Sequence, residues 1–321
     1  MFEYQAREDF LSARRKSILR EIVSFLRGHS NELLSWDEVK DELRIRGRVY
    51  RGFEEVPVDK IIGSVGRYQD FDRAFLPRTD DMEHRWKGIA GARYRQVSLP
   101  PIKLYKVGDA YFVLDGNHRV SVAKEQGVKT LRAEVIEARS RVPVDADLNA
   151  DNLEIKGEYA RFLERTQLDE LRPDQDIEFT IGGAYERLLE HIAVHRYFMA
   201  VEQGRPVSED EAVCDWYDNV YQPLVHVIRE REVLEDFPGR TEADLYLWII
   251  EHQYFLHQEY GDVEQDEAAD HFADRYTSRP LKRIWHAVRR FFGGEGARKD
   301  LLRRGTQGAA DPDGESGSSE E

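Results

Sequence analysis

The chain has 321 residues, which exceeds the size at which a single hydrophobic core stops growing, so two domains are the expected organisation. Charged residues make up 34% of the sequence and apolar residues 40%, as in a soluble globular protein. No apolar stretch approaches the roughly 20 residues that span a bilayer, and the start MFEYQARED lacks the pattern of a signal peptide. The single cysteine, Cys214, cannot form an intrachain disulfide. We therefore expect a cytoplasmic protein with no membrane partner.

The net charge of −15 is distributed unevenly along the chain. Residues 1–145 hold 27 basic and 23 acidic residues, whereas the remainder holds 20 basic and 39 acidic ones. The second part repels anions as a whole. An anionic ligand is therefore expected to bind in the N-terminal part.

Residues 1–48 are predicted to form N-terminal helices. Residues 5–27 have the spacing of an amphipathic helix, and a second short helix follows the capping-box sequence Ser35-x-x-Glu38. The stripe expected to face the core from the first helix is Leu11, Ile18, Ile22 and Leu26, with Leu19 and Val23 beside it. The alternating run RIRGRVYR at 44–51 fits a solvated edge strand, with a nucleic-acid-binding arm as the alternative.

Residues 49–145 have the pattern of a small α+β domain. Apolar residues at 56–62 lead into a glycine-containing loop, and a polar, Arg-rich connection follows at 85–95. Two apolar runs, 102–107 and 111–114, flank Gly108-Asp109 and predict a β-hairpin. A short helix from about Val120 ends at Gly127, and another strand is expected at 131–136.

The rest of the chain is predicted to be helical. A linker at 143–151 precedes a helical domain over 152–278, in which Ser208-x-x-Glu211 is a capping signal. A basic amphipathic helix is expected at 279–304 and a disordered acidic tail at 305–321. The expected helices of the domain are 157–166, 183–203, 208–232, 241–260 and 263–276.

The densest group of chemically useful side chains is Asp115-Gly116-Asn117-His118-Arg119, at the junction of a strand with a helix. Glycine permits a sharp turn, and the first amides of the helix have no partners within it, so they can bind an anion. Arg119 offers a planar fork to phosphate oxygens, His118 a hydrogen-bond donor, and Asp115 a carboxylate for a divalent cation or a proton. The alternative is a capped turn in which Asp115 and Asn117 bond backbone amides.

Residues 50–140, with the runs VPVDKIIGSVGRYQDF and LPPIKLYKVGDAYFVLDGNHRVSVAKEQGVKTLRAEV, resemble the ParB/sulfiredoxin-like superfamily. The resemblance implies an α+β nucleotide-binding domain whose glycine-containing motif holds phosphates. Among its variants, the motif at 115–119 is most similar to the Asp-Gly-His-His-Arg of free-serine kinases, with Asn117 in place of one histidine. The sulfinic-acid reductases have cysteine at that place, which argues against reductase chemistry, and the partition proteins have Gly-Glu-Arg-Arg.

The whole chain also resembles a bacterial family of actinobacterial type, in which such a domain is fused to a helical domain of unknown function. That resemblance implies an architecture but no activity. Together these observations predict a ParB/sulfiredoxin-like N-terminal domain followed by an all-α domain.

The resemblance places a second wall of the nucleotide pocket at Gly63-Ser64-Val65-Gly66-Arg67, where Ser64 and Arg67 would assist. The alternative is that this segment forms only a loop. The function expected is binding of a nucleoside triphosphate, ATP or CTP, with Mg²⁺ at Asp115. Phosphoryl transfer or nucleotide hydrolysis would follow, with Asp115 and His118 as the catalytic residues. The alternative function is a DNA-binding regulator or partition-like adaptor that uses the nucleotide as a conformational switch.

Two signals in the helical part remain open. The histidine pairs His191/His195 and His252/His257 suit either a metal site or bonds to neighbouring carboxylates and carbonyls, and they lack the spacing of known metal motifs. The basic segment 280–304 suits a solvated face, a nucleic-acid contact or docking on the acidic helices. The sequence leaves the oligomeric state open, a homodimer included.

Overall fold

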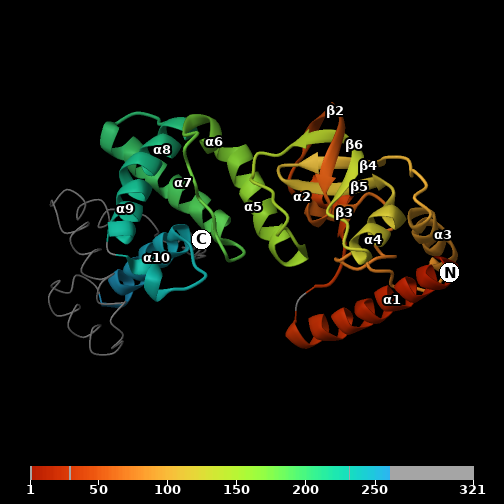
Figure 1. Ribbon diagram of the computed structural model, residues 1–321. Coiled ribbons are helices and arrows are strands. Elements are labelled where there is room, and N and C mark those ends of the chain that lie inside the picture. The colour runs from red at the N-terminus through yellow and green to blue at the C-terminus, as the bar shows by residue number, and fades with distance from the viewer. Residues whose placement is uncertain (1, 29, 231, 261–321) are drawn as a thin grey trace, which may run out of the picture. The chain divides into compact units, whose positions relative to one another are not determined.

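A computed structural model describes residues 2–28, 30–230 and 232–260 of the chain (Figure 1). A mixed sheet with helices forms the N-terminal part and helices form the rest, which confirms the predicted α+β class with a helical C-terminal region. The first of two compact units comprises Met1–Asp169 with Ile181–Tyr185; the second comprises Glu170–Thr180 and, among the described residues, 186–260. None of the described helices is long and apolar enough to cross a bilayer.

The first unit is built on a six-stranded sheet with the order β1-β3-β5-β4-β6-β2. The hairpin of β4 and β5 is antiparallel, whereas β3 runs parallel to β5 and β4 runs parallel to β6. Strand β2 lies at one edge and is exposed over most of its length, which confirms the predicted edge strand. The strands are β1 Leu34–Ser35, β2 Arg46–Pro57, β3 Ile61–Ser64, β4 Ile102–Val107, β5 Ala110–Asp115 and β6 Thr130–Arg139.

Alternating side chains of the hairpin pack on both faces of this sheet. Leu104 and Val113 share a core cluster with Val120 of the helix that follows β5. On the other face, Tyr105 and Phe112 contact Trp36, and the ring of Trp36 lies 4.6 Å from that of Tyr105. The helices of this unit are α1 Phe2–Arg27, α2 Trp36–Glu42, α3 Glu83–Tyr94, α4 Asn117–Glu125 and α5 Ala150–Thr166, and a 3₁₀ turn η1 covers Val58–Lys60. Figure 1 shows α2 and α4 on opposite sides of the sheet.

Helix α3 replaces the polar connection that was expected at residues 85–95, so that prediction was wrong. Gly88 and Gly91 lower the helix propensity of this segment and obscure its apolar pattern. Burial of Trp86 overrides the low propensity, because its ring packs 5.7 Å from Phe10 and its Nε1 donates to Ser121 Oγ at 2.8 Å. The helix forms because the surrounding protein covers one side of it.

Helix α1 uses a different face from the predicted one. The core contacts come from Ala6, Phe10, Ala13 and Ser17, all of which are buried. The predicted stripe is instead exposed: Ile18 keeps 47% of its surface, Leu19 62% and Leu26 76%. The small residues Ala6, Ala13 and Ser17 let α1 approach its neighbours closely around Phe10, so the buried face is not the one with the largest apolar stripe.

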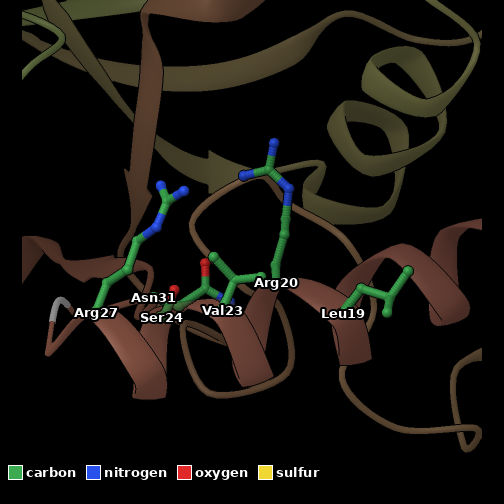
Figure 2. A pocket seen from close by; sticks show the side chains of 6 residues that line it. All are labelled: Leu19, Arg20, Val23, Ser24, Arg27 and Asn31. Atoms are coloured by element: carbon green, nitrogen blue, oxygen red, sulfur yellow. The ribbon is translucent and has the colours of Figure 1, made fainter.

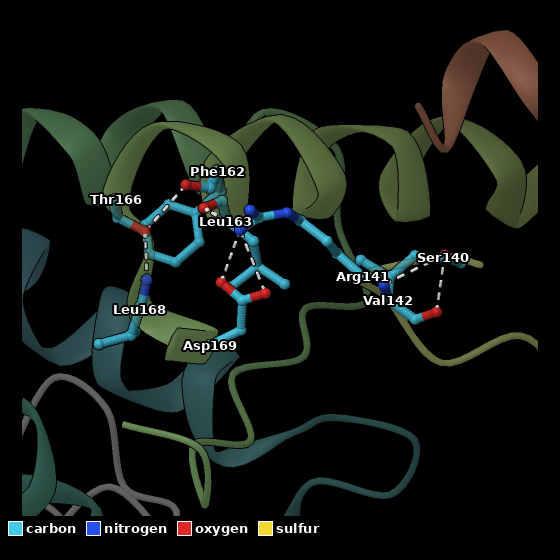
Figure 3. Close-up of polar contacts among 8 residues, drawn as sticks. All are labelled: Ser140, Arg141, Val142, Phe162, Leu163, Thr166, Leu168 and Asp169. Atoms are coloured by element: carbon cyan, nitrogen blue, oxygen red, sulfur yellow. Dashed lines mark hydrogen bonds and ion pairs between the residues drawn. The ribbon is translucent and has the colours of Figure 1, made fainter. Parts of the chain in front are cut away.

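The loop after β6 is tied to the end of α5 by Arg141 (Figure 3). Its Nη1 donates to the Leu163 carbonyl at 3.4 Å and to Asp169 Oδ1 at 3.0 Å. Asn149 caps α5 through a capping box, so the helix begins seven residues before the predicted start at 157. Helix α5 groups with the first unit, whereas the predicted linker at 143–151 assigned it to the helical domain.

The second unit is helical, as expected. Ser208 and Glu211 form the predicted capping box, and a π turn, labelled η2, interrupts the expected helix 208–232 just before Pro223, which has no N–H to donate. Buried aromatic rings form its centre, where Trp216 Nε1 donates to the Tyr246 hydroxyl at 3.0 Å. The elements are α6 Leu168–Leu171, which spans the boundary, α7 Ala184–Gln203, α8 Glu209–Trp216, η2 Tyr217–Tyr221, α9 Gln222–Glu230, the 3₁₀ turn η3 Val233–Asp236 and α10 Glu242–Tyr260.

Three predicted segments lie outside the described residues. They are the helix at 263–276, the basic helix at 279–304 and the acidic tail at 305–321. The predictions for them stay predictions.

We expect Gly63→Ala to destabilise the first unit by about 1–3 kcal/mol, because a Cβ there would lie 2.3 Å from Phe112 Cδ1 and 2.7 Å from the Leu34 carbonyl oxygen. Gly66→Ala is the matched control, since a Cβ at Gly66 would meet no atom within 4 Å. Urea unfolding of the parent and both variants measures the difference. Equal midpoints for Gly63→Ala and the parent would contradict the close packing of β3 on β5.

Candidate functional site

The candidate site begins at the turn between β5 and α4. Gly116 is the residue before the helix and has a φ of 114°, a left-handed conformation that favours glycine. A Cβ at this position would lie 2.6 Å from Ile102 Cγ2. No side-chain hydrogen bond caps α4 at this residue, and the predicted binding of an anion by the first amides of the helix stays a prediction.

The loop after β3 lies against the first turn of α4. The buried Ser64 hydroxyl donates to the Gly66 carbonyl and, at 3.2 Å, to the Val113 carbonyl. Asn117 Nδ2 also reaches the Gly66 carbonyl, at 3.5 Å. The two segments that were expected to form the walls of a pocket are therefore adjacent. Ser64 holds the loop in place through its own backbone contacts.

Two buried polar atoms of α4 have no hydrogen-bond partner within the described chain. They are Asn117 Oδ1 and His118 Nδ1, in side chains that are 8% and 5% exposed. Leaving such an atom unpaired costs about 1–3 kcal/mol. Both lie in the first turn of α4, where a ligand could pair with them.

His118 is held neutral by its surroundings. Its ring stands edge-on to Phe71 at 5.4 Å. Burial, together with the charges of Arg85 and Arg67, lowers its pKa to about 4, and the charge of Asp70 partly opposes this shift. At neutral pH the imidazole therefore has one N–H donor and one acceptor nitrogen.

Arg67 and Arg85 bring positive charge to the site from two directions. Arg67 follows β3 in a left-handed conformation, with a φ of 57°, and its Nη1 lies 3.2 Å from Asp70 Oδ2. Arg85 extends from α3, is exposed, and forms no hydrogen bond or ion pair with the described residues. Sequence reasoning missed Arg85 because its segment was taken as a connection. The spacing of Trp86 and Ala90 and the Glu83/Lys87 pair were the available signals of a helix.

Arg119 and Asp115 form an ion pair with each other. Arg119 Nη2 lies 2.7 Å from Asp115 Oδ2, and its Nη1 donates to the carbonyls of Pro100 and, at 2.8 Å, of Pro101. The Arg119 side chain is 12% exposed and that of Asp115 is 62% exposed. Arg119 thus fastens α4 to the start of β4, and its predicted phosphate contact would compete with these bonds. Asp115 remains accessible from solvent.

A divalent cation at this site would need most of its coordinating oxygens from a bound nucleotide and few from the protein. Within the described residues no cluster of three or more His, Cys, Asp or Glu side chains could hold a metal ion. Mg²⁺ commonly binds through one or two carboxylates together with substrate phosphates. The exposed Asp115 carboxylate fits that mode, and its predicted catalytic role stays a prediction, like that of His118.

The histidine pair of α7 does not form a metal site among the described residues. His195 Nε2 lies 2.7 Å from Asp215 Oδ2. This contact matches the interpretation in which the histidines bond neighbouring carboxylates. Burial lowers the pKa of His191, whose ring lies 6.4 Å from that of Tyr246. The side chains of His252 and His257 fall outside the described part of the chain.

Comparisons with known proteins each match less than a third of the chain. Residues 184–277 match a family described as "Domain of unknown function (DUF4032)". No curated protein matches the chain. Among solved structures, "Crystal structure of Sulfiredoxin from Arabidopsis thaliana" is similar over 28% of this chain and 89% of that chain, with 20% identity and a TM-score of 0.22. A TM-score this low does not assign a fold, so the superfamily resemblance still rests on the sequence motifs.

We expect His118 to make the first unit less stable in acid. In the unfolded chain His118 takes up a proton near pH 6.5, whereas in the folded chain it does so only near pH 4. His118 therefore leaves the free energy of unfolding unreduced above about pH 6.5. As the pH falls towards about 4, this free energy decreases by up to roughly 3 kcal/mol, because the unfolded chain binds the proton more tightly. Urea unfolding at several pH values in this window compares the parent with His118→Gln. Identical pH slopes for the two proteins would show that His118 is not held neutral.

Proposed function

We propose that the first unit has a ParB/sulfiredoxin-like fold and binds the phosphates of a nucleoside triphosphate at the N-terminus of α4. The observation that supports this most strongly is the pair of unpartnered buried atoms, Asn117 Oδ1 and His118 Nδ1, in an uncapped first turn. A helix N-terminus with free amides favours negative charge. Buried atoms that lack partners in the free protein gain them when the ligand binds.

The charges around this turn suit a polyphosphate. The charges of Arg67 and Arg85 both act on the imidazole of His118, in the first turn of α4. An anion with several negative oxygens at this turn would be attracted by both charges. Neutral His118 can donate a hydrogen bond there without adding to the positive charge.

The remaining polar groups suit the rest of a nucleotide and its reaction. Asn117 Oδ1 is an acceptor, and it fits a hydroxyl or amino donor of the ribose or base better than a phosphate. Asp115 would bind Mg²⁺ with the phosphates or accept a proton from the attacking group. The proposed activity is phosphoryl transfer or hydrolysis of ATP or CTP. A nucleotide switch in a DNA-binding adaptor would use the same pocket without turnover, and its nucleic-acid contact would come from 280–304.

Arg85→Ala is expected to weaken nucleotide binding about ten- to a hundredfold, because the variant lacks a charge-assisted contact. Lys87→Ala is the matched control: it removes the same charge from α3, but Lys87 is paired with Glu83 at 2.9 Å. Calorimetric titration of each protein with ATP and CTP, with and without Mg²⁺, measures the affinities. No binding of either nucleotide by the parent would contradict the proposal. Equal affinities in parent and Arg85→Ala would remove Arg85 from the site.

Asp115→Asn is expected to reduce turnover more than binding, since a carboxylate beside phosphates acts chiefly through a metal or a proton. The substitution also weakens the bond to Arg119, so urea unfolding of the variant serves as the control for a structural effect. Phosphate release under saturating nucleotide and Mg²⁺ is the measurement. A parent that binds nucleotide but releases no phosphate, alone or with small-molecule acceptors, would favour the switch over the enzyme.

A further inference from the structure

Asp70 places a second carboxylate beside the first turn of α4. Its Oδ2 lies 3.2 Å from Arg67 Nη1. The residue before Arg67 is Gly66, whose carbonyl accepts a hydrogen bond from Asn117 Nδ2 at 3.5 Å, so the Arg67/Asp70 pair lies close to the start of that helix. Burial lowers the pKa of His118 in the same turn, and the charge of Asp70 partly opposes that shift.

The neighbouring acid, Asp72, is fixed in its own turn. It is 1% exposed, and its Oδ1 accepts hydrogen bonds from the N–H groups of Ala74 at 2.9 Å and Leu76 at 2.8 Å. Burial raises its pKa, and the charge of Arg20, which lines a pocket together with Asn31 (Figure 2), opposes that shift. Of the two acids in this loop, Asp70 is therefore the one that can exchange its partner.

The bond between Arg67 and Asp70 is one that phosphates can replace. Their side chains are 51% and 38% exposed, and ion pairs this close to solvent are weak. The Asp70 carboxylate bonds only to Arg67 within the described chain. Arg119 is different, because it is 12% exposed and is held by two proline carbonyls as well as by Asp115. Arg67 can therefore leave its carboxylate more easily than Arg119 can.

A carboxylate released beside phosphates favours the binding of a cation. Groups of like charge at one place repel each other, and a divalent cation bound by both removes that repulsion. Mg²⁺ is typically held by one or two carboxylates together with substrate phosphates. Asp115 offers one such carboxylate, which is engaged by Arg119 at 2.7 Å. Asp70 would offer another, and the nucleotide itself would free it.

We propose that Asp70 holds Arg67 in the free protein, that the phosphates of the nucleotide displace it, and that the released carboxylate then binds the accompanying Mg²⁺. Arg67 passes from an internal carboxylate to a phosphate. One side chain thereby couples the binding of nucleotide to the binding of the cation. This inference rests on the proposed nucleotide site and adds the residue that makes tight binding there depend on Mg²⁺.

The test is calorimetric titration of the full chain and of Asp70→Asn with ATP and CTP, each with and without Mg²⁺. Without Mg²⁺ we expect Asp70→Asn to bind about three- to tenfold more tightly than the parent, because Arg67 then has no internal competitor. The gain in affinity that Mg²⁺ gives to the parent should fall at least about tenfold in Asp70→Asn, because one charged ligand of the cation is lost.

Asp109→Asn is the matched control. It also removes a carboxylate from an ion pair of the first unit, since Asp109 Oδ2 lies 3.2 Å from Lys60 Nζ, but Asp109 precedes β5 whereas Asp115 ends it. Its affinities with and without Mg²⁺ should equal those of the parent. The double variant Arg67→Ala/Asp70→Asn isolates the competition: without Mg²⁺ it should bind like Arg67→Ala, within about twofold.

Three results would overturn this inference while the parent still binds nucleotide. Equal Mg²⁺-free affinities of the parent and Asp70→Asn would show that Asp70 does not compete for Arg67. A tightening that persists in the double variant would assign it to simple repulsion between Asp70 and the phosphates. A Mg²⁺ gain that is lost in Asp115→Asn but kept in Asp70→Asn would assign the cation to Asp115. Absence of nucleotide binding by the parent would instead reject the proposed function and this inference with it.

Discussion

The turn at Gly116 is the constraint on which the candidate site depends. Its left-handed backbone directs the chain from β5 into α4 at a point where Ile102 leaves no room for a side chain. The turn buries Asn117 and His118 beside the loop after β3, where one polar atom of each has no partner in the described chain. Arg119 then locks the same turn to the start of β4. The free protein thus bears the cost of these two unpaired atoms, which the proposed ligand would offset.

Burial and charge act together on His118. A protonated imidazole beside Arg67 and Arg85 would add a third positive charge to a poorly hydrated corner, so its pKa falls to about 4. The neutral ring can remain packed against Phe71 and still offer a donor to a phosphate. The arginines provide the lasting positive charge, because guanidinium groups stay protonated at any physiological pH.

Local patterns predicted those elements whose form is decided locally. The β4/β5 hairpin, the glycine turn between β5 and α4 and the Ser208 capping box each follow from a few adjacent residues, although α4 begins at Asn117 and not near Val120 as expected. Helix α3 and its Arg85 were missed because burial of Trp86, a tertiary contact, outweighs two helix-weakening glycines. The hydrogen bonds of Arg119 to the carbonyls of Pro100 and Pro101 could not be predicted from the sequence either, since they join residues 18 or 19 positions apart. Sequence spacing therefore located the candidate site but could not say which of its arginines is already engaged.

The proposed anion-binding site must work within a chain of net charge −15. Residues 146–321 hold 39 acidic and 20 basic residues, and these repel any anionic surface. Salt at physiological strength screens such repulsion beyond about 8 Å, whereas proposed contacts of Arg85 with a phosphate at hydrogen-bond distance would retain most of their strength. A small basic surface can therefore bind an anion although the whole chain is acidic. The local arrangement of arginines, and not the net charge, decides where anions bind.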